Sequence, residues 1–105
     1  MMILIGDIGN TDIKIALFNN KNKKYIFKKR FNSSLFHSND INIQFKDLKK
    51  HFSKIDKILF SSVVPKKFKI IKKYLEKITG KKCYELNKLK IEKLIKVKVN
   101  RNQLG

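Results

Sequence analysis

The 105-residue sequence has no tryptophan, one proline and one cysteine. Because Cys83 is alone, the chain cannot form an internal disulfide or a cysteine-based metal cluster, and a reducing cytoplasm is the expected compartment. No apolar run approaches the ~20 residues that a transmembrane helix needs. Residues 1–5 lack a basic lead and are soon followed by Asp7, which is not typical of a signal peptide. The sequence therefore predicts a cytoplasmic chain without a membrane partner.

Acidic residues and arginine are also scarce. Eight Asp and Glu stand against 26 Lys and Arg, which gives a net charge of +18. Such a charge is typical of proteins that bind nucleic acid. However, only Arg30 and Arg101 are arginines, and arginine is the residue that favours base readout and bidentate phosphate contacts. Because the lysines are spread along the whole chain, we interpret them as solvated faces with a general affinity for polyanions, which argues against a dedicated nucleic-acid site.

Three β-strands are predicted in the first third of the chain. Residues 2–5 form a continuous apolar run that ends near Asp7, which is typical of a central strand buried on both faces. Gly9 and the asparagine after it indicate a tight turn. Apolar residues then alternate over residues 13–17 and again over residues 25–31. The three segments together predict an antiparallel meander.

Two helices are predicted farther along the chain. Apolar residues at successive spacings of three, four and three place one helix near 44–55 and another near 65–79. Pro65 suits the first turn of the second helix, where its missing N–H costs nothing. Gly80 is a natural end for that helix.

The remaining segments complete a recognisable order of elements. Residues 56–64 predict a fourth strand and residues 83–86 a short fifth one, while residues 89–99 fit either a helical turn or an edge strand. The order β-β-β-α-β-α-β, with three antiparallel strands before helix-linked parallel ones, predicts a mixed sheet. It is the pattern of a ribonuclease-H-like α/β lobe. With no linker or internal repeat, residues 1–105 are expected to form one domain.

One stretch has the residue types of a phosphate site. Asp7, at the end of a buried strand, can hold Mg²⁺ directly or through water. Gly9 lacks a side chain, so backbone N–H groups can approach phosphate oxygens. Lys14 adds a positive charge. An ordinary hairpin turn is the simpler explanation of these residue types alone, because turns of this composition are common, and the surrounding sequence is what favours a phosphate site. The full stretch is Asp7, Ile8, Gly9, Asn10, Thr11, Asp12, Ile13 and Lys14.

The other candidate residues have simpler interpretations. His37 and His51 lie fourteen residues apart with no carboxylate spaced for a metal site, and His51 is expected on the solvent side of its helix. Cys83 is interpreted as a small apolar strand residue rather than a nucleophile. Ser61 and Ser62 either line a ligand cleft at a strand end or cap the helix that follows.

Two separated motifs give the chain a family resemblance. Residues 7–11 followed by Lys14 resemble the first phosphate motif of the type III pantothenate kinases, and residues 58–65 resemble that family's strand ending in Ser-Ser-Val-Val-Pro. These kinases belong to the superfamily of acetate and sugar kinases, heat-shock chaperones and actin. The two motifs occur in the family's order.

The resemblance implies a fold and an activity. The family has two ribonuclease-H-like lobes with ATP in the cleft between them, so residues 1–105 are expected to be the N-terminal lobe, with the second lobe absent from this chain. Residues 7–14 would be the ATP phosphate loop, with Asp7 as the expected Mg²⁺ ligand. The implied reaction transfers the γ-phosphoryl group of ATP to pantothenate in coenzyme A biosynthesis. A monovalent cation, K⁺ or NH₄⁺, and a homodimer are also implied.

The resemblance also locates the family's substrate site near the end of this sequence. Gly105 matches the first residue of a Gly-Ala-Asp-Arg motif whose Asp is the general base, and Lys98 occupies the position of a pantothenate-binding Tyr. The usual Asn-Pro is here Asn100 followed by Arg101. We therefore expect no catalytic residue in this chain and no turnover by it alone. The alternative is a small basic binding or regulatory module without catalysis.

A missing second lobe would leave apolar surface uncovered. We therefore expect Val63, Val64 and the apolar residues of segment 91–99 to be more exposed than in a self-sufficient domain.

Overall fold

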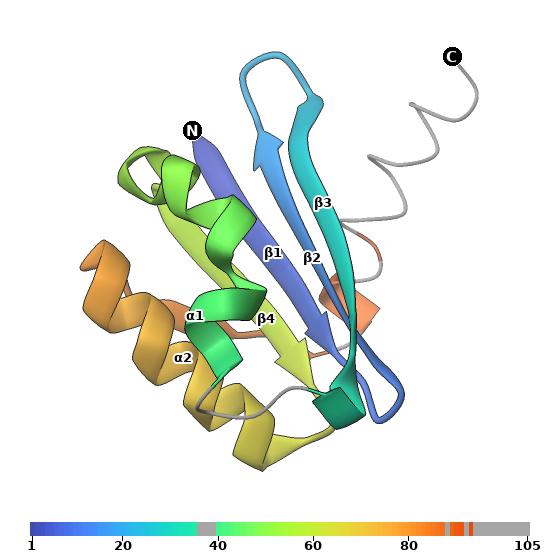
Figure 1. The fold of residues 1–105 in the computed structure, drawn as a ribbon. Helices are drawn as coiled ribbons and strands as arrows, with labels where there is room; N and C mark the ends of the chain where they lie inside the picture. The colour runs from blue at the N-terminus through green and yellow to red at the C-terminus, as the bar shows by residue number, and fades with distance from the viewer. Residues whose placement is uncertain (36–39, 88, 92, 94–105) are drawn as a thin grey trace.

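The computed structural model describes residues 1–35, 40–87, 89–91 and 93. It contains one five-stranded sheet with the strand order β3-β2-β1-β4-β5 (Figure 1). The strands are β1 (Met2–Ile8), β2 (Asp12–Asn19), β3 (Lys24–Asn32), β4 (Lys57–Ser62) and β5 (Cys83–Glu85).

The sheet is mixed, as predicted. Strands β1, β2 and β3 form an antiparallel meander. Strand β4 pairs in parallel with β1, and β5 pairs in parallel with β4. Strand β1 therefore lies at the centre, as expected from its continuous apolar run.

Helical segments connect the strands and cover one face of the sheet. They are η1 (Ser33–Leu35), α1 (Ile41–Gln44), η3 (Lys46–Lys54) and α2 (Pro65–Thr79). Figure 1 shows α1 and α2 on the same side of the strands. The predicted order of strands and helices is confirmed. In the described part of the chain, no helix combines the length and apolarity needed to cross a bilayer.

The helix predicted near 44–55 has a different conformation. A four-residue α-helix ends at Gln44, and the nine residues of η3 are a 3₁₀ helix. The 3₁₀ helix has three residues per turn, which suits the apolar spacings of three from Phe45 to Leu48 and from Phe52 to Ile55. The inward-facing residues were identified correctly, because Leu48 and Phe52 are buried.

Helix α2 begins and ends where the sequence predicts. Pro65 occupies the first turn, and Gly80 has the left-handed φ of 70° that ends many helices. Ile71 and Leu75 are fully buried, whereas Ile78, at the end of the predicted apolar stripe, is 46% exposed.

The main core lies between the sheet and the helical layer. Alternate residues of β1, β2 and β4 point into it. Its members come from all five strands and from α1, η3 and α2. They include Leu4, Ile8, Ile13, Ile15, Leu17, Phe31, Phe45, Leu48, Phe52, Ile55, Ile58, Phe60, Ile71 and Leu75.

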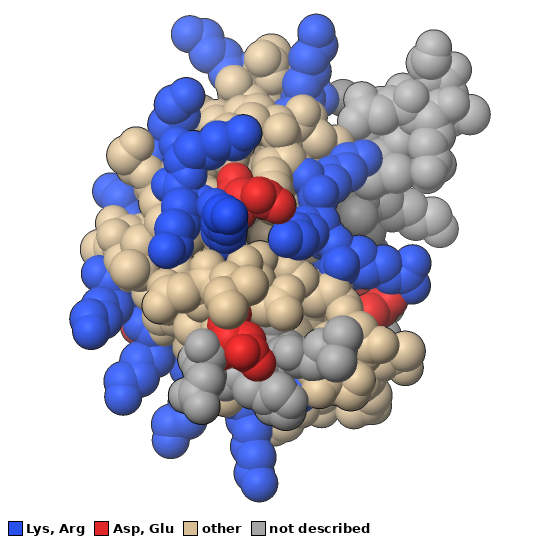
Figure 2. Space-filling model, viewed as in Figure 1, with Lys and Arg blue, Asp and Glu red and all other residues tan. Residues whose placement is uncertain are grey.

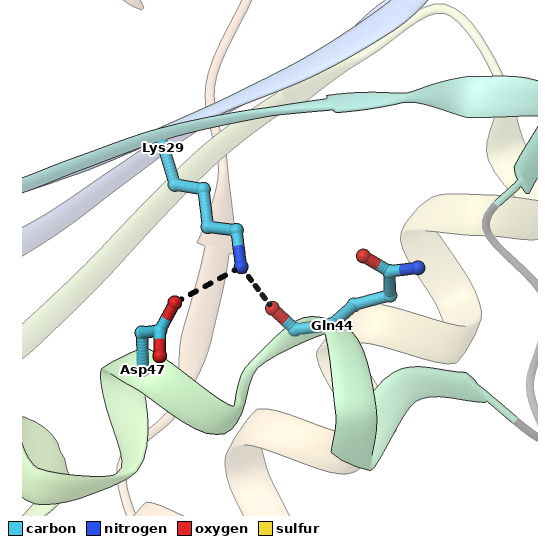
Figure 3. A network of polar contacts seen from close by, with 3 residues as sticks. All are labelled: Lys29, Gln44 and Asp47. Carbon is cyan, nitrogen blue, oxygen red and sulfur yellow. Dashed lines mark hydrogen bonds and ion pairs between the residues drawn. The ribbon is translucent and has the colours of Figure 1, made fainter.

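A lysine fastens the helical layer to β3. The Lys29 ammonium donates a hydrogen bond to the Gln44 carbonyl oxygen at 3.3 Å and forms an ion pair with Asp47 Oδ2, also at 3.3 Å (Figure 3). Lys29 points toward the helical side of the sheet because its cross-strand partner is the core residue Ile15. Its aliphatic stem lies along apolar surface while the ammonium reaches the polar edge.

The expected exposure of apolar residues is confirmed only in part. Val63 is 51% exposed, whereas Val64 packs partly buried against the core. Ile91 is fully buried, contrary to expectation. Its N–H donates to the Asn87 carbonyl oxygen at 3.2 Å, and this helical turn directs the Ile91 side chain inward. The rest of that segment, residues 92 and 94–99, lies outside the described residues.

Gly6 is predicted to be intolerant of any side chain. A Cβ at this position would lie 2.1 Å from a ring atom of Phe60, whose ring is fully buried. We expect Gly6→Ala to lower the free energy of unfolding by about 1–3 kcal/mol, the usual cost of overpacking a core. Urea unfolding of the purified chain measures this change.

Phe60→Val provides the control because it removes the ring atoms that collide. The cost of Gly6→Ala should be smaller in the Phe60→Val background than in the original chain, since the two residues share one space. Additive costs in the double variant would show that the contact with Phe60 is not the cause.

Candidate functional site

The candidate site lies at the turn between β1 and β2. The strand pair closes at Ile8 and Ile13, and the Gly9 N–H donates to the Asp12 carbonyl oxygen at 2.9 Å across the turn. Asn10 and Thr11 at its tip are exposed. In Figure 1 this turn lies at the same end of the sheet as the start of α2.

Asp7 is held by the neighbouring parallel strand. The register of β1 and β4 pairs Asp7 with Ser61, and the Ser61 hydroxyl donates to Asp7 Oδ1 at 2.9 Å. Ser61 is buried and Asp7 is half-buried. The hydroxyl therefore orients the carboxylate at the end of the sheet while leaving it within reach of solvent.

The two serines at the end of β4 have separate roles. Ser61 contacts Asp7, as a residue lining a ligand site would. The Ser62 hydroxyl accepts a hydrogen bond from the Val64 N–H at 3.0 Å, next to the first residue of α2. Helix α2 has Val64 at its N-cap and no side-chain cap hydrogen bond, so the capping alternative is wrong, and Ser61 remains the candidate for lining a ligand site.

The charged residues around the turn form one ion pair and leave one cation unengaged. Asp12 is paired with the guanidinium of Arg30 on β3. Lys14 is paired with Asp7 across the strands, so the two side chains share a face of the sheet. The Lys14 ammonium is exposed and forms no hydrogen bond or ion pair with a described residue. Asp7 and Lys14 are therefore the charges available to a ligand here.

Ser33 was not identified from the sequence, yet it contacts the turn twice. Its hydroxyl donates to the Gly9 carbonyl oxygen at 2.6 Å, and its N–H donates to the Thr11 carbonyl oxygen at 2.9 Å. The Lys67 ammonium of α2 in turn donates to the Ser33 carbonyl oxygen. A serine after a strand and a lysine in a lysine-rich helix carry no distinguishing sequence signal.

Three carbonyl oxygens of the turn are occupied, whereas two of its N–H groups are free within the described part of the chain. The carbonyl oxygens of Gly9, Thr11 and Asp12 all accept hydrogen bonds from within the protein. Neither the Asn10 N–H nor the Thr11 N–H donates to another described residue. Consecutive unpaired N–H groups in a turn form a concavity suited to anions.

The Asp7 carboxylate suits a metal ion that arrives with its own ligands. Among the described residues, no three His, Cys, Asp or Glu side chains group closely enough to hold a metal ion. Mg²⁺ is commonly bound through one or two carboxylates together with substrate phosphates and water. Asp7 fits this mode because Ser61 orients it and the donors of the turn lie beside it.

His51 differs from expectation, because it is half-buried rather than on the solvent side. Its ring lies 6.1 Å from the Phe27 ring, and its Nδ1 atom is buried without a hydrogen-bond partner in the described structure. Burial, with added repulsion from Lys50 and Lys54, lowers the pKa of His51. The apolar contact follows from the tighter 3₁₀ winding of η3. His37, Lys98 and Gly105 lie outside the described residues.

Cys83 is a buried strand residue, as interpreted from the sequence. It is 1% exposed, and burial together with the Glu76 carboxylate raises the pKa of its thiol to about 12. The thiol is therefore neutral at physiological pH and unsuited to act as a nucleophile.

Comparison with known proteins identifies the family. A model of the type III pantothenate kinases matches residues 3–105. The chain belongs to this family. The type III pantothenate kinase of Pelagibacter ubique (strain HTCC1062) is 43% identical over 108 residues, an alignment that covers 99% of this chain and 42% of the relative. The chain thus spans less than half the length of that type III pantothenate kinase.

The fold has a counterpart among solved structures. A Bacteroides thetaiotaomicron protein with an actin-like ATPase fold and unknown function superposes with a TM-score of 0.57 at 11% identity. The match covers 90% of this chain and 37% of that protein. The predicted ribonuclease-H-like fold of this type III pantothenate kinase chain is thereby confirmed.

The Cys83 thiol is predicted to resist alkylation in the folded chain. With a thiol pKa of about 12 against about 8.5 for a free cysteine, iodoacetamide at pH 8 should react at least about 100-fold more slowly than with the unfolded chain. Mass spectrometry of timed samples, with and without guanidinium chloride, measures both rates. Equal rates would contradict the burial of this thiol.

Proposed function

We propose that residues 1–105 are the N-terminal lobe of a kinase that transfers the γ-phosphoryl group of ATP to the hydroxyl of pantothenate, in coenzyme A biosynthesis. The observation that carries the proposal is the turn after β1. In a chain of the type III pantothenate kinase family, it places free backbone N–H groups beside a carboxylate that Ser61 holds at the end of the central strand.

The proposed role of residues 7–14 is to bind the phosphates of ATP. The Asn10 and Thr11 N–H groups would donate to phosphate oxygens, and the exposed Lys14 ammonium would offset their charge. Asp7 would hold Mg²⁺, directly or through water. Phosphoryl transfer depends mainly on positioning and charge neutralisation, and these residues supply both on one side of the phosphate chain.

The remaining parts of the reaction are assigned outside this site. A second lobe would close over ATP and bring the Asp that takes the pantothenate hydroxyl proton. Lys98 and Gly105 are proposed to lie toward pantothenate. A monovalent cation, K⁺ or NH₄⁺, a homodimeric complete enzyme and a cytoplasmic location belong to the same proposal.

Asp7→Asn is predicted to weaken binding of Mg²⁺·ATP selectively. Interactions with a charged group contribute about 1.5–3 kcal/mol, so the dissociation constant should rise about 10- to 100-fold. Binding of ATP without Mg²⁺ should not weaken, because the carboxylate then only repels the phosphates. Isothermal titration calorimetry in Mg²⁺ and in EDTA measures both constants.

Asp47→Asn is the matched control for Asp7→Asn. It changes the net charge equally but breaks only the exposed ion pair with Lys29, so the affinity for Mg²⁺·ATP should stay near that of the original chain. An equal loss in both variants would show that bulk charge, not Asp7, determines binding. A chain that binds ATP and unrelated polyanions alike would support the alternative of a basic binding module.

The 105-residue chain alone is predicted not to phosphorylate pantothenate. Loss of a positioned base costs about 10²–10⁴ in rate, and lack of the opposite wall of the cleft should lower the rate further. A coupled assay that follows ADP release with pantothenate present tests this, with the Pelagibacter ubique enzyme as the positive control. Turnover comparable to that enzyme would place the base within residues 1–105.

A further inference from the structure

Ser33 connects the β1–β2 turn to the rest of the protein. It follows directly after β3 and is 1% exposed. Its hydroxyl and its N–H each donate to a different carbonyl oxygen of the turn, on Gly9 at 2.6 Å and on Thr11 at 2.9 Å. These contacts join residues more than twenty positions apart in the sequence, so the hairpin alone does not determine the shape of the turn.

Lys67 extends this connection to the helical layer. It lies in the first turn of α2, and its ammonium donates to the Ser33 carbonyl oxygen. Helix α2 follows directly on the end of β4, whose Ser61 holds Asp7. The same helix–strand unit therefore fixes both the carboxylate and, through Lys67 and Ser33, the turn beside it.

The planarity of the peptide bond gives these contacts a consequence for binding. The Gly9 carbonyl and the Asn10 N–H belong to one planar trans peptide group and point in opposite directions. When the Ser33 hydroxyl holds the carbonyl oxygen inward, the Asn10 N–H must face away from Ser33. The contact with the Thr11 carbonyl fixes the Asp12 N–H in the same way.

We infer that Ser33 and Lys67 are positioning residues that keep the turn in the conformation that accepts phosphate. The inference rests on the proposed function, because it takes the bound anion to be the phosphate chain of ATP. Without the Ser33 hydroxyl, the peptide between Gly9 and Asn10 can rotate and present its carbonyl oxygen to the ligand. That oxygen repels phosphate where the N–H attracts it.

Matched pairs of variants test the inference. Ser33→Ala is compared with Ser34→Ala, which removes a neighbouring hydroxyl that donates to Asn32 Oδ1 at 2.7 Å and does not contact the turn. Lys67→Met is compared with Lys66→Met, which makes the same charge change at an exposed lysine without a hydrogen bond or ion pair among the described residues. Ser33→Thr and Lys67→Arg retain the donors and should rescue.

The first measurement needs no nucleotide. Amide hydrogen exchange of the Gly9 and Ser33 N–H groups, followed by NMR in the full chain, reports how firmly the turn is held. Exchange should be about fivefold faster in Ser33→Ala and Lys67→Met than in their controls, because a hydrogen bond contributes about 1 kcal/mol. Exchange in β1 and β4 should stay unchanged, which a general loss of stability would not allow.

The second measurement is the affinity for Mg²⁺·ADP by calorimetry. Ser33→Ala and Lys67→Met should each raise the dissociation constant about three- to tenfold relative to their controls, and the Thr and Arg variants should restore it. Variants that match their controls in both exchange and affinity would overturn the inference. If Ser33→Ala does not fold, the comparison of Lys67→Met with Lys66→Met, together with rescue by Lys67→Arg, tests the inference by the same two measurements.

The two proposals fail in different ways. If the original chain binds no nucleotide, the proposed function fails, and amide exchange alone decides whether Ser33 and Lys67 hold the turn. If the chain binds Mg²⁺·ADP and Asp7→Asn weakens binding while the Ser33 and Lys67 variants do not, the proposed function stands and the inference fails.

Discussion

The parallel pairing of β1 with β4 places side by side two segments that are 54 residues apart at Asp7 and Ser61. A parallel pair requires a crossover connection, which here comprises the meander strands and the helical segments before β4. The pairing also brings the Phe60 ring over Gly6, so the central strand can have no side chain there. Packing of the core and orientation of the carboxylate thus depend on one strand register.

The features that could be predicted from the sequence are those set by local signals and not by this register. Alternation of apolar residues determined the strands, and the proline and glycine flanking α2 determined its ends, because these signals are local. The inward residues of η3 were also predictable, since the apolar side chains must face the core whether the segment is an α-helix or a 3₁₀ helix. The 3₁₀ winding was not, because the apolar spacings of three and four are those expected of an α-helix. His51 became half-buried as a result.

The candidate site shows the same division between local and distant causes. Asp7 and Gly9 stand out because they belong to a motif that resembles the family's phosphate motif, whereas the residue types alone are common in hairpin turns. Ser33 and Lys67 act through the backbone of the turn, and any serine or lysine at that point would look ordinary in sequence. Their importance appears only when the chain returns from β3 and from β4 to the same end of the sheet.

Electrostatics favours an anionic ligand at this end without a concentrated basic patch. Figure 2 shows Lys and Arg distributed around the helical face with acidic residues among them. The described residues contain two ion pairs, Lys29 with Asp47 and Arg30 with Asp12, so most of the charge of +18 is solvated and screened by salt. Under the proposed function, selectivity for phosphate would therefore come from the backbone geometry of the turn and not from net charge.

The single oriented carboxylate has a further consequence for the order of binding. Mg²⁺ dehydrates reluctantly and needs oxygen ligands in near-octahedral geometry. The turn supplies N–H groups, which cannot coordinate a cation. A free Mg²⁺ ion would gain only the Asp7 carboxylate and would still face Lys14 on the same face of the sheet. Under the proposed function, a nucleotide would bring phosphate oxygens that satisfy the N–H groups and the metal together. Metal and nucleotide would then bind as one unit, each strengthening the attachment of the other.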